Sequence, residues 1–221
     1  MKRHDLLREL HRVYRPRTYL EVGVNDGRSL ALSRVKSIAV DPAFKVTRPI
    51  SCDVRLVKAT SDNYFARPKA VEFFPGRLID LSFIDGMHLF DFALRDFINI
   101  ERFSRWTSLV VFDDMLPRSI DEAARDRHTG PWTGDVYKLV EVLGEHRPDL
   151  LCVVVDTQPT GQLLVFGGDP DNRILPSLYD ELIEKWVVPD PQEVPARVLS
   201  RGDAVDPEAF LAAPFWRELM I

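Results

Sequence analysis

Cysteine and long apolar stretches are scarce in this chain. Only Cys52 and Cys152 occur among its 221 residues, too far apart for a zinc ribbon or a redox motif, and two cysteines provide no disulfide framework. No stretch approaches ~18 consecutive apolar residues, and charges are scattered through the N-terminal MKRHDLLRELHRVYR. We therefore expect neither a membrane span nor a signal peptide, and predict a cytoplasmic protein.

Basic residues are also fewer than acidic ones. Lys and Arg number 29 against 34 Asp and Glu, which gives a net charge of −5. Proteins that bind the phosphate backbone of nucleic acids rely on an excess of basic side chains, so nucleic acid is not an expected partner unless a local patch overrides the sum. The length and the 45% hydrophobic content predict one domain with a substantial core.

Short apolar runs alternate with amphipathic segments along most of the chain. The amphipathic segments predict helices over residues 6–13, 88–103 and 134–143. This alternation is typical of βα units and predicts an α/β fold with a Rossmann-like, doubly wound, mostly parallel sheet. The predicted strands cover residues 18–22, 37–40, 54–57, 78–84 and 108–112.

The C-terminal part of the chain follows a different pattern. Apolar runs over residues 151–155 and 162–166 are joined by DTQPTG, which is too short for a helical crossover, so the two should pair as an antiparallel hairpin. Residues 189–207 are rich in proline and predict an extended connector before a last helix over 207–219. We divide the chain into a domain of residues 1–188 and an arm of residues 189–221, which either wraps the domain or contacts a second copy in a homodimer.

Acidic residues lie at the ends of four of the predicted strands. They are Glu21 in Glu21-Val22-Gly23-Val24-Asn25-Asp26-Gly27, then Asp41, Asp85, and the pair Asp113-Asp114. In open α/β sheets, ligands bind outside the carboxyl ends of the strands, so this is where we expect a site. Glycine allows a tight turn close to a ligand, and a following helix would offer free N–H groups. The GxGxxG of a dinucleotide site is lacking, and a plain strand-to-helix turn remains an alternative.

The segment from Glu21 to Gly27 resembles the first motif of the class I S-adenosylmethionine-dependent methyltransferases, an acidic residue, one further residue, then Gly-x-x-x-Gly. The resemblance implies that the turn containing Gly23, Asn25 and Gly27 lies under the amino-acid part of S-adenosylmethionine. It also implies that Asp41 holds the ribose. Ser61 matches the adenine contact of that family, although Ser61-Asp62 fits an ordinary helix start equally well.

A second set of residues resembles the metal-dependent small-molecule O-methyltransferases of the sugar and catechol types. It consists of IDLSFIDGMH, which contains Asp85 and His88, and VVFDD, which contains Asp113 and Asp114. The resemblance implies that Asp85, Asp113 and Asp114 hold Mg²⁺, that Asp85 also borders the cofactor, and that His88 is the general base. A strand-ending turn and a helix cap are the alternative interpretations of these acids.

A long polar segment follows the second acid pair, and such loops often carry specificity. Within residues 125–138, Trp132, His128 and Lys138 could line the acceptor pocket and Asp135 could serve as an extra acid, although ordinary packing and a helix cap explain them equally well. The favoured function is methyl transfer to a hydroxyl of a small molecule, a sugar or phenol of a secondary metabolite. The alternatives are a nucleotide-dependent oxidoreductase, a non-catalytic cofactor-binding protein and a metal-dependent hydrolase.

Overall fold

The computed structural model describes residues 1–219, and its centre is a seven-stranded sheet. The strands are β1 (Thr18–Val22), β2 (Lys36–Val40), β3 (Val54–Val57), β4 (Leu81–Ile84), β5 (Leu109–Asp113), β6 (Leu151–Val155) and β7 (Gln162–Phe166). Their order is β3-β2-β1-β4-β5-β7-β6, parallel from β3 to β5, with β7 antiparallel to both β5 and β6. The predicted mostly parallel sheet and its C-terminal antiparallel hairpin are confirmed.

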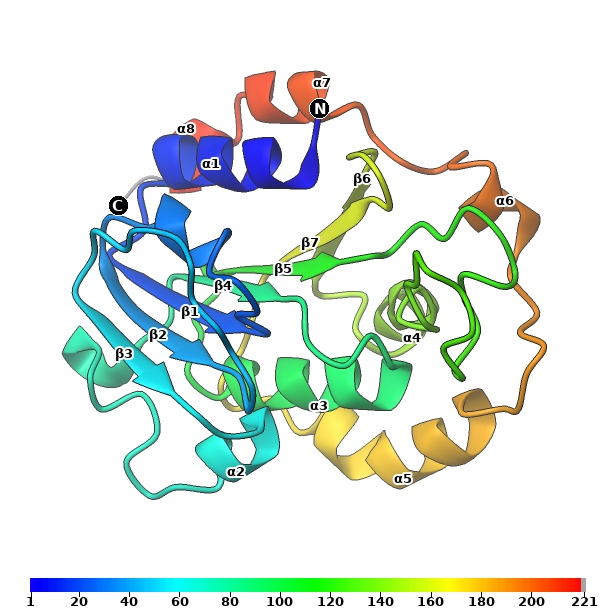
Figure 1. Cartoon of the computed structure of the whole chain (residues 1–221), viewed down its shortest axis with the longest axis horizontal. Coiled ribbons are helices and arrows are strands. Elements are labelled where there is room, and N and C mark those ends of the chain that lie inside the picture. Colours follow the sequence, from blue (N-terminus) through cyan, green and yellow to red (C-terminus); the bar gives the residue numbers. More distant parts are fainter. Residues whose placement is uncertain (220–221) are drawn as a thin grey trace.

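Helices cover both faces of the sheet (Figure 1). The helices are α1 (Arg3–Tyr14), α2 (Ser61–Phe65), α3 (Phe90–Glu101), α4 (Lys138–His146), α5 (Ile174–Trp186), α6 (Ala196–Leu199), α7 (Pro207–Ala212) and α8 (Trp216–Leu219). On one face α1 lies beside α7 and α8, and on the other α3 lies against α2, α4 and α5. The doubly wound arrangement is therefore confirmed, and none of the helices in residues 1–219 has the length and apolarity to cross a membrane.

The two faces bury separate cores, as the alternation of side chains along a strand requires. Leu20 and Val22 point to the side of α3, α4 and α5, whereas Tyr19 points to the side of α1. Glu21 follows the direction of Tyr19 and pairs in register with Phe83, which packs in the same core as Leu6 of α1. Asp85 lies two residues beyond Phe83, so the same alternation directs its carboxylate toward the α1 side of the sheet.

The helix expected after the glycine turn is absent from the described residues, and that prediction was wrong. Only a single 3₁₀ turn, η1 (Leu30–Leu32), follows Gly27, and the chain is already extended at Ser33. Serine hydroxyls compete with helix hydrogen bonds here, since Ser29 donates to Glu21 and Ser33 contacts the Ser37 hydroxyl at 2.9 Å. The helix N-terminus that was expected to present free N–H groups does not form.

The predicted starts of β4 and of the fourth helix also move. β4 begins at Leu81 and not at residue 78, because Ile79 donates its N–H to the Phe103 carbonyl and Asp80 accepts the Arg17 N–H. The fourth helix begins at Lys138 and not at Gly134, which lies in the left-handed region with φ +60°.

The C-terminal segment wraps the same domain. The predicted last helix is two helices, α7 and α8, because Ala213 precedes a proline and takes an extended conformation with ψ 139°. Phe210 and Trp216 are buried in the core on the side of α1. The connector before them is interrupted by the short α6, and α5 lies in a segment for which no element was predicted.

Candidate active site

The turn after β1 is packed directly against the end of β4. Gly23 has φ +86° and donates its N–H to the Val40 carbonyl, and a Cβ at this position would lie 1.9 Å from the carbonyl oxygen of Asp85. Gly27 has φ +80°, and a Cβ there would lie 2.9 Å from Cγ1 of Val46. Glycine is required at residue 23 both by the backbone angle and by the close approach of β4.

Asp41 holds this turn in place. Its Oδ2 accepts the N–H groups of Val24 at 2.8 Å and Asn25 at 2.9 Å, and its Oδ1 accepts that of Ala43 at 2.6 Å. An ionised carboxylate has about four acceptor sites, so roughly one remains for a ligand. The Asp41 carboxylate lies at the predicted strand end, where it caps the glycine turn.

Glu21 lies behind the turn with no exposed surface. One carboxyl oxygen accepts the Tyr19 hydroxyl at 2.6 Å and the other accepts the Ser29 hydroxyl at 3.0 Å. Burial raises the pKa of Glu21 to about 8, against the opposing effect of these two hydrogen bonds. Glu21 is thus a buried support of the turn.

Ser61 stands at the start of α2, where Thr60 is the N-cap residue and accepts the Asn63 N–H at 3.2 Å. The Ser61 side chain contacts Asp96 of α3, whose pKa is raised by burial to about 7. Asp96 borders a cavity of ≈ 20 Å³ that also touches Asp85, His88 and Asp113. Ser61 therefore lies next to Asp96, and Asp96 shares this cavity with Asp85, His88 and Asp113.

The three carboxylates predicted as metal ligands converge at the ends of β4 and β5. They surround one nitrogen, Nη1 of Arg3, which donates to Oδ2 of Asp113 and lies 3.8 Å from Asp85 Oδ2 and 3.9 Å from Asp114 Oδ1. Arg3 lies at the start of α1, so it comes from the helix that covers this side of the sheet. We call Asp85, Asp113 and Asp114 together the acid cluster.

His88 bridges two members of the acid cluster. Its Nδ1 lies 2.7 Å from Oδ2 of Asp114, and its Nε2 lies 3.4 Å from Oδ1 of Asp85. The backbone at His88 has φ +55° and that at Asp114 has φ +63°, a region that non-glycine residues seldom adopt. Such conformations gather at functional sites, where the surrounding structure holds them.

Burial and mutual repulsion set the protonation of the acid cluster. The pKa of Asp85 rises to about 8, mainly through burial and then through the charge of Asp114. The pKa of Asp113 is raised well above its usual range for the same reasons. Burial also acts on Asp114, but the contact with His88 outweighs it and lowers its pKa. The site thus holds one strongly ionised carboxylate beside two that retain protons more readily.

A divalent cation has suitable ligands here. Asp85, His88 and Asp114 each offer one ligand atom, and these atoms lie within 4.8 Å of one another. Oδ1 of Asp113 is buried and has no hydrogen-bond partner among the described residues. This group contains His88 in place of Asp113, which was one of the three predicted ligands and whose Oδ2 is paired with Arg3.

The segment of residues 125–138 folds over His88. Trp132 lies against the His88 ring, with ring centroids 5.3 Å apart, and its Nε1 donates to the Ala124 carbonyl at 2.6 Å. At Gly134, a Cβ would lie 1.7 Å from the His88 carbonyl oxygen. Trp132 therefore lies beside His88, and its role in an acceptor pocket stays a prediction.

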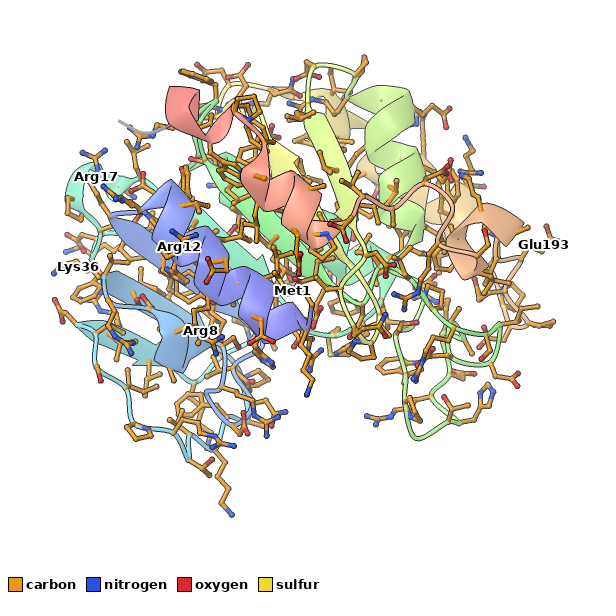
Figure 2. The ribbon with its side chains drawn as sticks, turned by 90° about the horizontal axis from the view of Figure 1, so that it is seen from above. Met1, Arg8, Arg12, Arg17, Lys36 and Glu193 are labelled. Atoms are coloured by element: carbon orange, nitrogen blue, oxygen red, sulfur yellow. The ribbon has the colours of Figure 1, made fainter. Side chains whose placement is uncertain are left out.

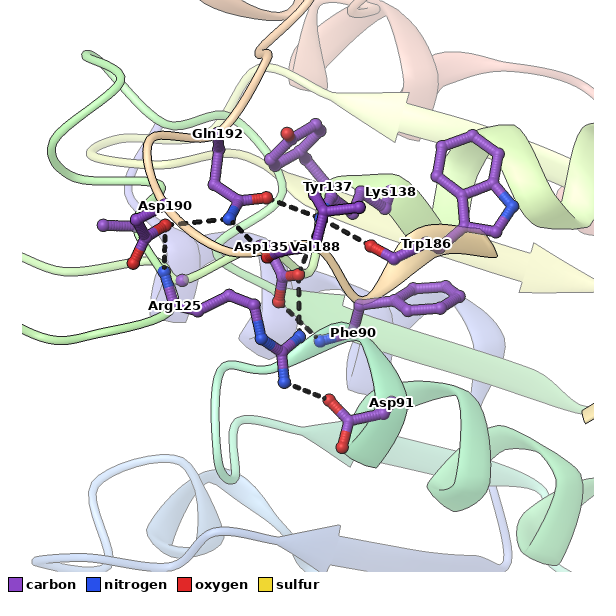
Figure 3. Close-up of polar contacts among 12 residues, drawn as sticks. Phe90, Asp91, Arg125, Asp135, Tyr137, Lys138, Trp186, Val188, Asp190 and Gln192 are labelled. Atoms are coloured by element: carbon purple, nitrogen blue, oxygen red, sulfur yellow. Dashed lines mark hydrogen bonds and ion pairs between the residues drawn. The ribbon is translucent and has the colours of Figure 1, made fainter. Parts of the chain in front are cut away.

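Lys138 and Asp135, suggested for the acceptor pocket and as an extra acid, are bound to other protein groups in this structure. Lys138 is buried and donates to Asp135 at 2.9 Å, to Gln192 at 2.5 Å and to the Trp186 carbonyl at 2.8 Å (Figure 3). Asp135 also accepts from Arg125 at 2.8 Å. These contacts tie the segment to the C-terminal arm. His128 is exposed and contacts Asp126 and Asp121.

Comparison with known proteins supports the fold. No family model matches the chain, and no curated protein matches it. The O-methyltransferase TomG from Streptomyces achromogenes, involved in tomaymycin synthesis and solved with S-adenosylmethionine, is 18% identical, with TM-score 0.53 over 75% of this chain and 79% of that one. An O-methyltransferase from Bacillus cereus in complex with S-adenosylhomocysteine is 14% identical, with TM-score 0.52 over 74% and 80%.

A third solved structure agrees with these two. The S-adenosylhomocysteine-bound methyltransferase PaMTH1 from Podospora anserina is 14% identical, with TM-score 0.52 over 75% of this chain and 78% of that one. This chain has the methyltransferase fold. At this identity the likeness concerns the arrangement of strands and helices, so the chemistry must be argued from the side chains.

Proposed function

We propose that this chain is an S-adenosylmethionine-dependent O-methyltransferase that acts on a hydroxyl of a small molecule, such as a sugar or a phenol of a secondary metabolite. The observation that carries the proposal is the acid cluster with His88 at the ends of β4 and β5, next to the glycine turn of β1. A sheet alone would support many functions, whereas a carboxylate cluster with an adjacent histidine suits removal of a hydroxyl proton.

The turn after β1 fits a nucleoside cofactor in part. Gly23 and Gly27 bring bare backbone to the strand end, and Asp41 stands beside them with about one free acceptor site. We propose that Gly23, Asn25 and Gly27 lie under the amino-acid part of the cofactor and that Asp41 accepts one ribose hydroxyl. Ser61 and Asp85 would border the remainder, and Glu21 would keep the turn rigid. S-adenosylmethionine would supply the methyl group.

The acid cluster fits a hard divalent cation such as Mg²⁺, which prefers carboxylate oxygen. Asp85 and Asp114 would hold it, and Asp113 offers a further oxygen that is buried without a partner among the described residues, which leaves Nε2 of His88 available for proton transfer. Such an ion would lower the pKa of a bound hydroxyl. Arg3 stands at the same place, with Nη1 within 4 Å of an oxygen of each carboxylate, so its charge bears directly on whether a cation binds.

His88 is the proposed general base. Because Nδ1 faces the strongly ionised Asp114 at 2.7 Å, the hydrogen of a neutral ring belongs on Nδ1, and Nε2 keeps its lone pair for the acceptor's proton. Trp132 against the ring would restrict its rotation and form one wall for the acceptor. We place these roles on residues 1–188, with residues 189–221 as the arm that closes the segment over His88.

Calorimetric titration with S-adenosylmethionine and S-adenosylhomocysteine, with and without Mg²⁺, tests the proposal. We expect both nucleosides to bind, and Gly23→Ala or Asp41→Ala to weaken them, while Asp121→Ala at an exposed position leaves binding unchanged. If neither nucleoside binds to the folded protein, the proposal fails. Binding of NAD or NADP in their place would favour the oxidoreductase alternative.

A further inference from the structure

Arg3 is held firmly at the acid cluster by the backbone around it. Its own N–H donates to the Gln158 carbonyl at 3.0 Å, and the Gln158 N–H donates to the Met1 carbonyl at 2.9 Å. Leu6 and Leu7, one turn along α1, are fully buried in the core beneath the helix. The start of α1 is therefore fixed on both sides, and the guanidinium is aimed at the ends of β4 and β5.

The other arginines of α1 have different partners. Arg8 pairs with Asp5 and Arg12 pairs with Glu9, each one turn away on the exposed side of the helix (Figure 2). Arg3 instead reaches Asp113, 110 positions along the chain, whose carboxyl group is almost completely buried. A buried carboxylate without a cation is strongly destabilising, so this contact has a far larger effect than the surface pairs.

We propose that Arg3 is the resident counter-ion of the acid cluster and competes there with a divalent cation. The inference rests on the metal-binding part of the proposed function. Nη1 of Arg3 lies within 4 Å of an oxygen of each carboxylate. The one positive charge of Arg3 is therefore shared by the three carboxylates that would surround a divalent cation.

Two consequences follow from the geometry. A cation held by Asp85 and Asp114 has a guanidinium nitrogen beside it, 3.8 and 3.9 Å from oxygens of those two residues, and the like charges repel. A cation that also takes Asp113 must displace Arg3 from Oδ2 or use Oδ1, the oxygen without a partner among the described residues. Removing the Arg3 charge should therefore strengthen divalent-cation binding.

Titration of metal-free protein with Mn²⁺ alone, followed by electron paramagnetic resonance at a fixed pH of about 8, tests the inference without any methyl transfer. We expect Arg3→Met to bind Mn²⁺ at least about tenfold more tightly than the wild type, because one adjacent positive charge is lost. Arg3→Lys keeps the charge and should bind about as the wild type does. Arg8→Met is the matched control on the same helix and should bind like the wild type.

Thermal unfolding gives a second readout. The melting temperature of metal-free Arg3→Met should fall below that of the wild type, and saturating Mn²⁺ should raise it more in the variant than in the wild type. If Arg3→Met is not recovered folded, Arg3→Gln, which is neutral but still donates a hydrogen bond, replaces it with the same expectation.

Equal or weaker Mn²⁺ binding in the folded neutral variants would overturn the inference, and so would an absence of binding in every variant. The nucleoside titrations are independent of these outcomes, so a failure of the counter-ion inference can be told apart from a failure of the proposed cofactor.

Discussion

Two groups of carboxylates lie at the same edge of the sheet, and they are satisfied in different ways. At the turn after β1, Glu21 and Asp41 accept five hydrogen bonds from hydroxyl and backbone N–H groups of the protein. In the acid cluster, Asp113 accepts a hydrogen bond from Arg3, and one of its buried oxygens has no hydrogen-bond partner among the described residues.

The difference indicates that the carboxylates at the turn mainly hold the backbone in place, whereas those of the acid cluster can take part in the chemistry. Neutral donors fix the shape of a turn and leave little capacity for anything else, whereas a cluster that depends on a cation can exchange that cation for another ligand. We therefore expect substitutions at the turn to change stability together with nucleoside binding, and substitutions in the acid cluster to change mainly metal binding and rate. Four predictions test this contrast, from the largest expected effect to the smallest.

Gly23→Ala should have the largest effect, because residue 23 is where the two groups touch. A Cβ would lie 1.9 Å from the backbone oxygen of Asp85, the residue after β4, at a φ of +86°, so the strand ends must separate. We expect a loss of more than about 4 kcal/mol in the free energy of unfolding, measured in urea. Gly130→Ala, where an added Cβ meets nothing within 4 Å, should change it by less than about 0.5 kcal/mol. Similar losses in both variants would contradict the close packing.

Glu21→Gln should change how stability depends on pH. Burial raises the pKa of Glu21 from its ordinary 4.5 to about 8, so the folded protein keeps this proton while the unfolded chain releases it. Stability from this group is complete below about pH 4.5 and is lost as the pH rises to about 8. Relative to Glu21→Gln, the wild type should lose up to about 4 kcal/mol across that window. Glu72→Gln, at an exposed side chain, should keep the wild-type slope.

His88→Gln should reduce the methyl-transfer rate without unfolding the protein. Loss of a general base lowers rates by about 10²-fold or more, so kcat should fall while the affinity for S-adenosylhomocysteine stays constant. His128→Gln, in the exposed part of the segment that covers His88, is the control and should leave kcat unchanged. A parallel loss of nucleoside affinity in His88→Gln would assign the residue to binding in place of proton transfer.

Asp41→Asn should have the smallest of these effects. The amide retains one oxygen, but it loses the negative charge that strengthens the bonds from Val24, Asn25 and Ala43. We expect a loss of about 1–2 kcal/mol in the free energy of unfolding. Asp53→Asn, whose carboxylate is exposed and pairs with Lys36, should cost less. A larger loss at residue 53 would contradict the importance of the turn.

Strand positions and strand ends could be predicted because they follow from local patterns. The runs 18–22 and 151–155 are continuous and apolar or nearly so, and the carboxyl ends of parallel strands meet at one edge. That rule predicts that Asp85 and Asp113 lie close together. Helix α5 also carries a helical stripe, including Leu175, Leu178 and Leu182, which could have revealed it.

The partners of these carboxylates could not be predicted in the same way. The carboxylate oxygens of Asp41 accept hydrogen bonds from backbone N–H groups of loops, and the course of these loops depends on tertiary packing. Arg3 stands in an amphipathic segment where charged residues ordinarily face water, and nothing local indicates a contact 110 positions away. Only the strand alternation, which turns Leu109, Val111 and Asp113 toward α1, explains why this helix supplies the cation.

The contact between Gly134 and the His88 carbonyl has a consequence for the history of this protein. No side chain can be gained at residue 134 unless the backbone at residue 88 moves as well. The segment that covers His88 and the residue proposed as the base are therefore constrained to change together.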